Sequence, residues 1–477
     1  MITTAVRFST DDPALQTLYD AAEEKCRRNL KYFGGHPVLV EGGGYEKIWL
    51  ETQPMGGEMY AKRGMEAAVN NTLLFMHCQR ADGRLPGSIQ CMPDGTLEAQ
   101  FNKLQGFCMA EPALNLYYWL GQDRAYLADL ARCLEAFDQY LWTYRDSDGD
   151  GLLESWCVYD TGEDNAVRYG DAPVYWTQER APEGYQVVPM ASMDLMGFSV
   201  SCRQTLARIS GILTDGREAE WQTKADRVRA AIQEKIWDDA AGACFDRDKN
   251  HRVLPILTHN NLRCMYWGAF SQAMADRFVR EHLLNPAEFW TPLPLPSVAA
   301  NDPAFRNAPE NNWSGQPEGL TYQRAIRALE RYGYEKLVTM LGRKLLAAVQ
   351  AGGQVFTQQF DPFTGMPSRV GMISHRAPPE EGEPFQDAYG PTLLSVLEYI
   401  AHLWGVHMQE GRLWFSLCAA RAPYRYEQCW DERVFRIESD GREADVLIDG
   451  EKRYHAPCGL RLITDLSGRL LEQRALE

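Results

Sequence analysis

Apolar residues recur three and four positions apart along most of the chain, which is the spacing of one buried face of an α-helix. The segment "RAYLADLARCLEAFDQYLWTY" at 124–144 shows this pattern most clearly. A first helix is predicted to begin at Pro13, after a cap at Asp11 or Asp12. Further helices are predicted near residues 57–79, 104–120, 190–213, 217–237, 259–281, 317–333, 335–350 and 391–405.

Long loops rich in Asp, Gly and Pro separate these helices, and the longest lie at 301–319 and 360–391. Loops of more than about 15 residues in a compact domain are usually functional or disordered. Trp, Tyr and Phe in these loops argue against disorder. A ring of roughly twelve antiparallel helices with its long loops at one end fits this layout. The predicted fold is therefore mainly α, an (α/α)6 toroid over residues 1–405.

The pattern changes after about residue 405, where short β-prone runs alternate with Gly and Asp turns. These runs are "RLWFSL", "YRYEQCW", "RVFRIES", "ADVLIDG" and "GLRLITDLSG". Residues 406–477 are accordingly predicted to form a small, β-sandwich-like all-β module that packs against the helices.

Composition and charge narrow the classes of partner. Of the 477 residues, 45% are hydrophobic and 24% charged, as in soluble globular proteins. The net charge of −16, without a basic block, argues against nucleic acid and anionic membranes. No apolar run reaches the roughly 18 residues of a membrane helix, and the N-terminus does not resemble a signal peptide. We expect a cytoplasmic protein whose partner is a small molecule; its oligomeric state stays open.

The twelve cysteines show no CxxC pair and no metal-ligand spacing. In a cytoplasmic protein they are expected to be reduced thiols. Neither a metal nor another cofactor is predicted.

An acidic stretch, "SWCVYDTGEDNAVRY" at 155–169, places Asp160, Glu163, Asp164 and Arg168 between aromatic residues. It fits a surface loop, a cation site or a catalytic acid. The preceding "RDSDGDGLLES" begins like a calcium loop, but the twelfth position from Asp146 lacks the required Glu. A tight turn is favoured there, and a looser cation site stays open.

Carboxylates in aromatic loops are the remaining candidate chemistry, because the histidines do not cluster and no GxSxG motif is present. Cleavage of a glycosidic bond needs two carboxyl groups, one to donate a proton and one to activate water or attack carbon. Trp49 with Glu51 suits the face and hydroxyls of a sugar, although Glu51 alone fits a helix cap. The glycines of "VEGGGYEKIW" lack a phosphate-binding spacing and predict a flexible loop.

Six blocks in order across residues 45–405 resemble a known clan. The blocks are "IWLETQPM", "RDSDGDGLLES" with "DTGEDNA", "PMASMDLMGF" with Asp194, "PLPSVAANDPAF" with "NNWSGQPEGLTYQRAIRAL", "FTQQFDPFTG" and "FQDAYGPTLLSVLEYI". The sequence resembles the inverting α-glycosidases that include glycoside hydrolase family 63 and the trehalases. Within them it is most similar to bacterial enzymes acting on glucosyl- or mannosylglycerate and similar small glucosides.

The resemblance implies that Asp164 is catalytic and acts as the general acid. Crowding by Asp160 and Glu163, together with aromatic cover, is expected to raise its pKa, whereas pairing with Arg168 would lower it. The family's general base is a Glu three residues before the Asp of its ExFDP motif. Here Gln358 occupies that position, and a neutral amide cannot accept a proton from water. Two other carboxylates are then candidates for the base, Glu318 and Glu383.

The sugar pocket implied by the resemblance contains Trp49, Glu51, Gln105, Trp313, Gln358, Gln386 and Asp387. The predicted function is hydrolysis, with inversion, of a small α-linked, gluco-configured glycoside or oligosaccharide. One alternative is a sugar-binding protein that has lost its base at Gln358. Another is a polysaccharide lyase or other carbohydrate-active enzyme on the same toroid, in which arginines recognise an acidic sugar; the candidates are Arg168, Arg324, Arg369 and Arg376.

Overall fold

The computed structural model describes residues 2–309, 313–368, 370 and 386–477. This part of the chain is mainly helical and contains twelve α-helices. They are α1 Pro13–Arg28, α2 Gln53–Tyr60, α3 Met65–His77, α4 Ala110–Trp119, α5 Arg124–Tyr144, α6 Met193–Leu213, α7 Glu218–Ala231, α8 Asn260–Tyr266, α9 Gln272–Phe278, α10 Gly319–Glu330, α11 Glu335–Ala351 and α12 Gly390–Trp404. Two short π-helical segments, η3 Ile232–Ile236 and η4 Val279–Leu283, follow α7 and α9.

Local sequence signals account for several helix boundaries. The Asp12 carboxylate accepts hydrogen bonds from the first backbone N–H groups of α1, which confirms the predicted cap. Helix α5 has the predicted bounds and begins after a second capping aspartate, Asp123. The predicted helices at 57–79 and 259–281 are each two helices. Gly64 is extended between α2 and α3, and Gly268 has a left-handed φ of 70° between α8 and α9.

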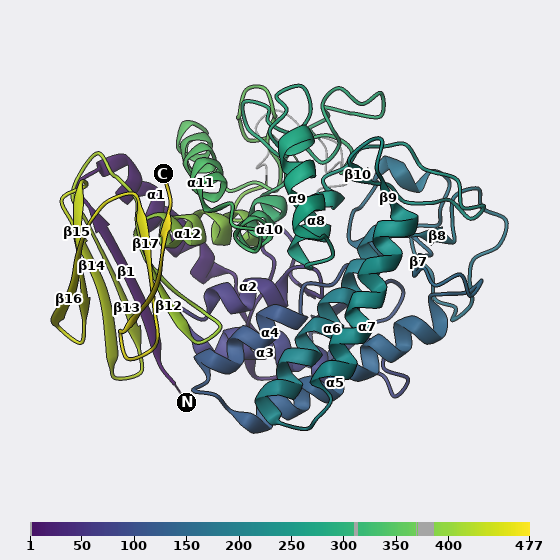
Figure 1. Ribbon diagram of the computed structural model, residues 1–477, viewed down its shortest axis with the longest axis horizontal. Coiled ribbons are helices and arrows are strands. Elements are labelled where there is room, and N and C mark those ends of the chain that lie inside the picture. Colours follow the sequence, from purple (N-terminus) through teal and green to yellow (C-terminus); the bar gives the residue numbers. More distant parts are fainter. Residues whose placement is uncertain (1, 310–312, 369, 371–385) are drawn as a thin grey trace.

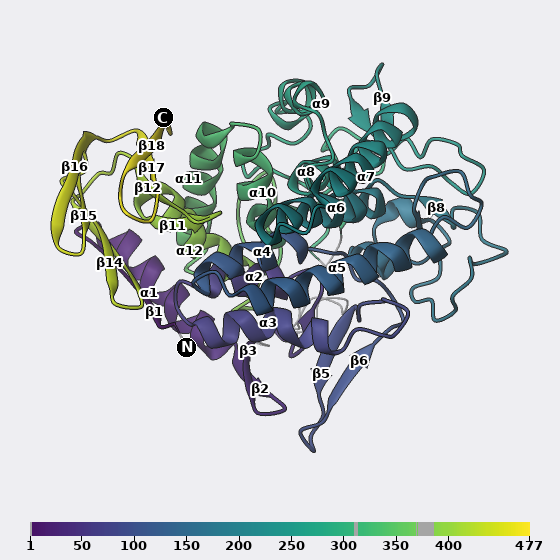
Figure 2. The same ribbon diagram turned by 60° about the horizontal axis from the view of Figure 1, so that its bottom comes forward.

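The even-numbered helices contact one another in sequence. Helix α2 packs on α4, α4 on α6, α6 on α8, α8 on α10, α10 on α12, and α12 returns to α2. Helices α3, α5, α7, α11 and α1 pack against members of this inner set, and Figures 1 and 2 show them from two directions. All 15 residues of α12 are buried. Because this inner helix has neighbours on all sides, its surface is largely apolar all round, and it has no solvent-facing polar side.

Two antiparallel sheets lie beside the helices and are formed mostly by the C-terminal residues (Figure 1). One has the order β1-β13-β14-β15-β16 and the other β11-β12-β17-β18. Strands β11 and β12 of the second sheet contact strands of the first. The bounds are β1 Thr4–Thr10, β11 Val406–Gln409, β12 Arg412–Leu417, β13 Tyr424–Trp430, β14 Arg433–Ser439, β15 Glu443–Ile448, β16 Glu451–Pro457, β17 Leu460–Thr464 and β18 Leu470–Ala475.

Strand β1 is an addition to the predicted architecture. It pairs with β13 along its whole length, from Thr4 opposite Trp430 to Thr10 opposite Tyr424. The small C-terminal sheet region is confirmed, and its first sheet also contains the N-terminal strand. The division of the chain at residue 405 stays a prediction.

Short strands and turns between the helices position the loops of the candidate site. They are β2 Leu30–Phe33, β3 His36–Leu39, β4 Ile48–Trp49, β5 Ser88–Cys91, β6 Leu97–Gln100, β7 Glu154–Ser155, β8 Met190–Ala191, β9 Trp237–Asp238 and β10 Ala243–Cys244, with the 3-10 turns η1 Val158–Thr161 and η2 Val167–Tyr169. Within the described ranges, no helix combines the length and the apolar character needed to cross a membrane.

Candidate active site

A cavity of about 270 Å³ lies near the N-terminal ends of α2, α10 and α12. Four carboxylic side chains line it, and they are Glu41, Glu46, Glu51 and Asp164. Aromatic side chains form much of the remaining wall, and they are Tyr45, Trp49, Tyr159, Tyr175, Trp313 and Tyr389. Gln105 and Gln358 also reach the cavity. The structure thus brings together six of the residues proposed from the sequence: Trp49, Glu51, Gln105, Asp164, Trp313 and Gln358.

Asp164 follows the turn η1, which ends at Gly162 with a left-handed φ of 78°. Burial raises the pKa of Asp164 to about 8, and the nearby charge of Glu51 acts in the same direction. The positive charge of Lys103 and a hydrogen bond from Tyr159 oppose this shift without reversing it. Asp164 is therefore protonated at neutral pH, the state that a general acid needs.

The neighbouring acids do not cause this shift, contrary to the expectation from the sequence. Asp160 accepts backbone hydrogen bonds from Leu104 at 2.9 Å and Trp156 at 2.8 Å, and pairs with Arg145 at 2.6 Å. Burial raises its pKa, but Arg145 and these donors bring it below the usual value. Asp160 is thus an ionised carboxylate that fixes the loop.

Glu163 and Arg168 belong to a buried ion network beneath the same loop. Arg168 pairs with Glu163, with Asp194 at 2.7 Å, and with Asp246. Arg263 joins the network at 3.2 Å from Glu163 and 3.0 Å from Asp194. Despite burial, the charges of Arg168 and Arg263 hold the pKa of Glu163 well below its usual value. The network anchors the acid-bearing loop to α6 and α8.

Glu51 precedes α2 and does not cap it, since Thr52 occupies the cap position. One carboxylate oxygen is 2.7 Å from Arg324 Nη2, and the other accepts a hydrogen bond of 3.3 Å from Gln105. Burial raises the pKa of Glu51, while Arg324 favours its charged form. A Cβ on Gly162 would lie 2.0 Å from the Glu51 carboxylate. The glycine in "DTGED" therefore allows the two loops to approach.

Glu318, one of the two predicted candidates for the base, lies just before α10 and is fully buried. Burial, Asp164 and Glu51 raise its pKa well above the usual value, and the Gln358 amide opposes them. Among the described residues, neither Glu318 carboxylate oxygen accepts a hydrogen bond of regular geometry. Its side chain is not part of the cavity wall. The other candidate, Glu383, lies outside the described residues.

Gln358 lines the cavity at the position where the resembled family has its base. Tyr45 donates a hydrogen bond of 3.2 Å to its side-chain oxygen. The Gln358 backbone N–H donates to Gln386, whose amide in turn donates to the Gly43 carbonyl at 3.0 Å. Gln386 thus supports the wall from behind and does not line the cavity.

Asp387 also lies away from the cavity. Its carboxylate pairs with Lys25 at 2.6 Å and accepts the backbone N–H of Phe356. These contacts tie α1 to the loop before α12. The sugar-binding role proposed for Asp387 would require an indirect effect through this loop.

The sequence analysis missed Glu41, which is buried and lies in the cavity wall. Tyr389 donates a hydrogen bond of 3.0 Å to its carboxylate. Burial, followed by the charge of Glu51, raises the pKa of Glu41 well above its usual value.

The glycines after Glu41 could have indicated this site. The loop was expected to be flexible, yet it packs closely against the start of α12. A Cβ on Gly42 would lie 2.1 Å from Asn29 Nδ2, and one on Gly43 would lie 3.1 Å from Tyr389. The glycine run therefore marks a close backbone approach.

Two groups of side chains have the ligand types and spacing to hold a metal ion in the part of the chain that is described. Asp148 and Asp150 of the predicted tight turn form one group with His251, and Asp148 and His251 are exposed. Carboxylates of this turn accept its own backbone N–H groups, including that of Gly151. The second group, Glu330, His402 and His407, lies far from the acid-bearing loop, at the opposite ends of the inner helices.

Comparisons with known proteins place this geometry in context. The mannosylglycerate hydrolase from Thermus thermophilus, a family 63 enzyme solved in complex with Tris, has a TM-score of 0.61 and 19% identity, over 80% of this chain and 100% of that one. A protein described as a sialidase has a TM-score of 0.71 and 13% identity, over 97% of this chain and 42% of that one. Neutral trehalase from Saccharomyces cerevisiae has a TM-score of 0.55 and 14% identity, over 77% of this chain and 74% of that one. At these identities the likeness shows the fold alone.

A search of curated proteins found no match. Residues 63–382 match the "Mannosylglycerate hydrolase MGH1-like glycoside hydrolase domain". This segment is more than half of the 477-residue chain and contains the acid-bearing loop and the inner helices α4 to α10. The chain therefore belongs to the MGH1-like family of glycoside hydrolases.

Proposed function

We propose that this glycoside hydrolase cleaves a small α-linked, gluco-configured glycoside with inversion, and that Asp164 is its general acid. The observation that carries the proposal is the pKa of about 8 at Asp164, inside an aromatic cavity that holds further carboxyl groups. Asp164 would donate its proton to the glycosidic oxygen as the bond to the anomeric carbon breaks. Water would attack that carbon from the opposite face and lose its proton to a second carboxylate.

Glu41 is our preferred base, and Glu318 is the alternative. Glu41 lies in the cavity wall, whereas Glu318 lies behind it. Both have raised pKa values because Glu41, Glu51, Asp164 and Glu318 are buried near one another. Coupled carboxyls of this kind share protons and titrate as a group. With Asp164 protonated, the group can still hold one ionised carboxylate to accept the proton from water.

The cavity size supports a small substrate. At about 270 Å³ it is near the lower end of small-molecule pockets, which are typically about 300–1,000 Å³. Trp49 and Trp313 can stack on a sugar ring, while Gln105 and Gln358 offer amides to its hydroxyls. The Thermus thermophilus enzyme has been solved in complex with Tris and D-glycerate. A short polar aglycone of similar chemistry is therefore included in the proposal.

The fold and setting form part of the same proposal. We infer that the inner helices α2, α4, α6, α8, α10 and α12 close an (α/α)6 toroid, supported by the return contact of α12 with α2. The catalytic domain would comprise residues 1–405 and the β module residues 406–477, with β1 added to the module. The cytoplasmic location rests on the sequence alone.

Proton NMR of the anomeric signals tests the reaction. The enzyme would be mixed with α- and β-linked disaccharides, glucosylglycerate and mannosylglycerate, and the first anomer released would be identified before mutarotation. We expect the β-anomer from an α-linked substrate, and no release by Asp164→Asn. Release of the α-anomer would contradict inversion, and an active Asp164→Asn variant would contradict the acid assignment.

A second experiment identifies the base. Glu41→Ala and Glu318→Ala would be assayed with and without azide, a small anion that can replace a missing carboxylate in the cavity. Azide should restore turnover only in the variant that lacks the base, which we expect to be Glu41→Ala. Gln358→Glu serves as the complementary variant, because a restored family base should raise the rate. Unchanged activity of Glu41→Ala without azide would exclude Glu41.

A sugar-binding protein without turnover is a second candidate function, favoured by one observation. Gln358, at the family base position, is held by Tyr45 in the cavity wall and cannot accept a proton. Isothermal titration with the same glycosides distinguishes the two functions: affinity without product release over hours would favour binding alone.

A further inference from the structure

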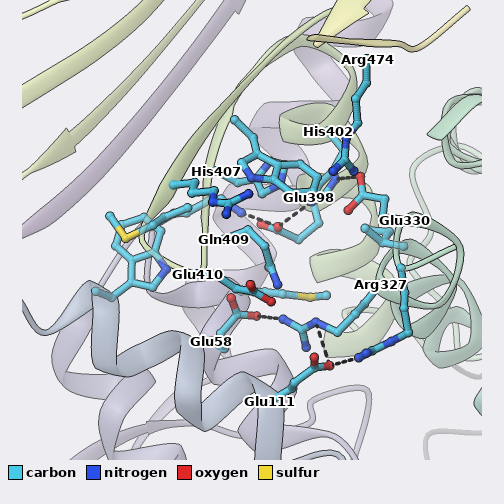
Figure 3. A pocket seen from close by; sticks show the side chains of 18 residues that line it. Glu58, Glu111, Arg327, Glu330, Glu398, His402, His407, Gln409, Glu410 and Arg474 are labelled. Atoms are coloured by element: carbon cyan, nitrogen blue, oxygen red, sulfur yellow. Dashed lines mark hydrogen bonds and ion pairs between the residues drawn. The ribbon is translucent and has the colours of Figure 1, made fainter. Parts of the chain in front are cut away.

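A second cavity, also of about 270 Å³, lies at the other ends of the inner helices. Its wall contains Glu58 of α2, Arg327 and Glu330 of α10, and Glu398 and His402 of α12, all near the C-terminal ends of their helices. Residues of strands β11 and β12 complete the wall, and Figure 3 shows His407 and Gln409 of β11. Since α12 has 15 residues and spans about 22 Å, the two cavities are separated by roughly one helix length.

The charged side chains of this wall are largely paired with one another. Lys62 pairs with Glu398, and Arg331 pairs with Glu111. Arg327 is 3.3 Å from Glu58, and Arg474 is 2.6 Å from Glu335. A ligand with a net charge would therefore meet few uncompensated charges. The groups that remain to bind a ligand are therefore mainly neutral hydrogen-bond donors and acceptors.

His407 and Trp414 are the clearest of these groups. His407 is 5% exposed and Trp414 is 8% exposed, and both belong to the wall of the cavity. Among the described residues, no hydrogen-bond partner is found for either ring nitrogen of His407. The same holds for the indole N–H of Trp414. One oxygen of Glu398 is also without a hydrogen bond. Buried polar groups are normally hydrogen-bonded, so this set of donors and acceptors points to a ligand.

A metal ion is the less suitable occupant. The donor atoms of Glu330, His402 and His407 lie within 4.8 Å of one another. However, one Glu330 oxygen already contacts both His402 Nδ1 at 2.8 Å and Arg461 at 2.6 Å. The positive charge of Arg461, which already pairs with Glu330, would also repel a metal cation.

We propose that this cavity is a second ligand site, which binds a neutral polyhydroxy molecule of monosaccharide size, either a cyclic sugar or an open-chain polyol. Each hydroxyl both donates and accepts a hydrogen bond, which matches a histidine ring, an indole N–H and a carboxylate oxygen. The indole rings of Trp119 and Trp414 add apolar surface for C–H groups. The ligand would contact α10, α12 and the strands together, and would so strengthen the packing of the β module on the helices. The proposal does not depend on which glycoside is cleaved at Asp164.

Isothermal titration of the full chain tests this site, with D-glucose and D-mannose as cyclic probes and D-sorbitol as the open-chain probe. Zinc chloride is the metal probe. His407→Phe and Trp414→Phe remove ring nitrogens with little change in volume. Each should weaken polyol binding about tenfold or more, because one or more hydrogen bonds are lost. Trp142→Phe is the matched control, since Trp142 lies in α5 outside the cavity and donates to the Ser199 hydroxyl.

The readouts separate this site from the catalytic cavity. In both cavity variants kcat/KM should be unchanged and the rise in melting temperature given by sorbitol should disappear, while glucose and mannose should lose only the binding event that does not belong to the catalytic cavity. Circular dichroism confirms that each variant is folded. Preference between glucose, mannose and sorbitol assigns the cyclic or the open-chain ligand. Stoichiometry and affinity that both variants leave unchanged for every polyol, binding of zinc alone, or no binding of any polyol would each overturn the proposal.

Discussion

At the residue scale, the burial of Asp164 sets the expected pH dependence of catalysis. Its pKa of about 8 means that the proton is present below pH 8 and lost above it. We therefore expect kcat/KM to fall as the pH rises through about 8, because the deprotonated carboxylate cannot protonate the leaving group. A profile of kcat/KM between pH 5 and 10 measures this decrease, the alkaline limb of the profile.

Glu51→Gln is the matched variant for this profile. The charge of Glu51 raises the pKa of Asp164, so its removal should shift the alkaline limb to lower pH. An unshifted limb in Glu51→Gln, or a flat wild-type profile from pH 6 to 9, would be inconsistent with Asp164 as the titrating acid.

The same residue is expected to reduce stability at neutral pH. Between pH 4 and 8 the folded state retains the Asp164 proton and the unfolded state releases it, so this contribution to stability falls as the pH rises. Asn has no proton to lose. The melting temperature of Asp164→Asn should therefore exceed that of the wild type by a margin that grows from pH 5 to 8 and is constant above pH 8. Calorimetry at several pH values measures this margin.

Asp160→Asn provides the contrast. The Asp160 carboxylate is ionised and pairs with Arg145 in full burial. Its removal leaves a buried guanidinium without its counter-charge, which typically costs about 3–5 kcal/mol. We expect Asp160→Asn to lower the free energy of unfolding, measured in urea, by that order. Stabilisation of both variants would contradict the distinction between the two aspartates.

At the element scale, the turn η1 places the acid, and Gly162 ends this turn. Its φ of 78° disfavours any other residue, and a Cβ there would collide with the Glu51 carboxylate. Gly162→Ala should cost about 1–3 kcal/mol of stability and displace Asp164, with a clear loss of kcat. Gly149→Ala is the control, because Gly149 also has a positive φ but no neighbour near its Cβ position. Equal loss of kcat in both variants would argue against the contact with Glu51.

The accuracy of sequence-based prediction also differs between elements for physical reasons. Helix α5 has one buried face, so its apolar spacing gave its bounds directly. The apolar pattern continued through the break between α2 and α3, because residues on both sides of it are buried. The motif around Asp164 was enough to propose this residue for the cavity that it lines. Glu41 could not be proposed in this way, since its position in the cavity depends on a distant contact with Tyr389.

At the scale of the whole molecule, the N-terminal strand β1 lies in one sheet with the C-terminal strands β13 to β16. A fragment of residues 1–405 would leave β1 without β13 and would expose the surface of α12 that β11 and β12 cover. We expect this fragment to aggregate or to unfold without cooperativity, as measured by sedimentation and urea titration. Co-expression with residues 406–477 is the control and should restore soluble material. A stable, monomeric 1–405 fragment would contradict this expectation.

The pairing of β1 with β13 also has a consequence for synthesis of the protein. The hydroxyl of Thr10 donates a hydrogen bond to the carbonyl of Pro423, 413 residues later. Ribosomes add about 5–20 residues each second, so the first strand waits roughly 20–80 s for its partner to emerge. During that interval its edge is open to other nascent chains. A circular permutant that begins at α1 and carries residues 1–11 after Glu477, through a linker long enough to reach Thr4, would remove this delay. Its yield without chaperones would measure the effect of the delay on folding in the cell.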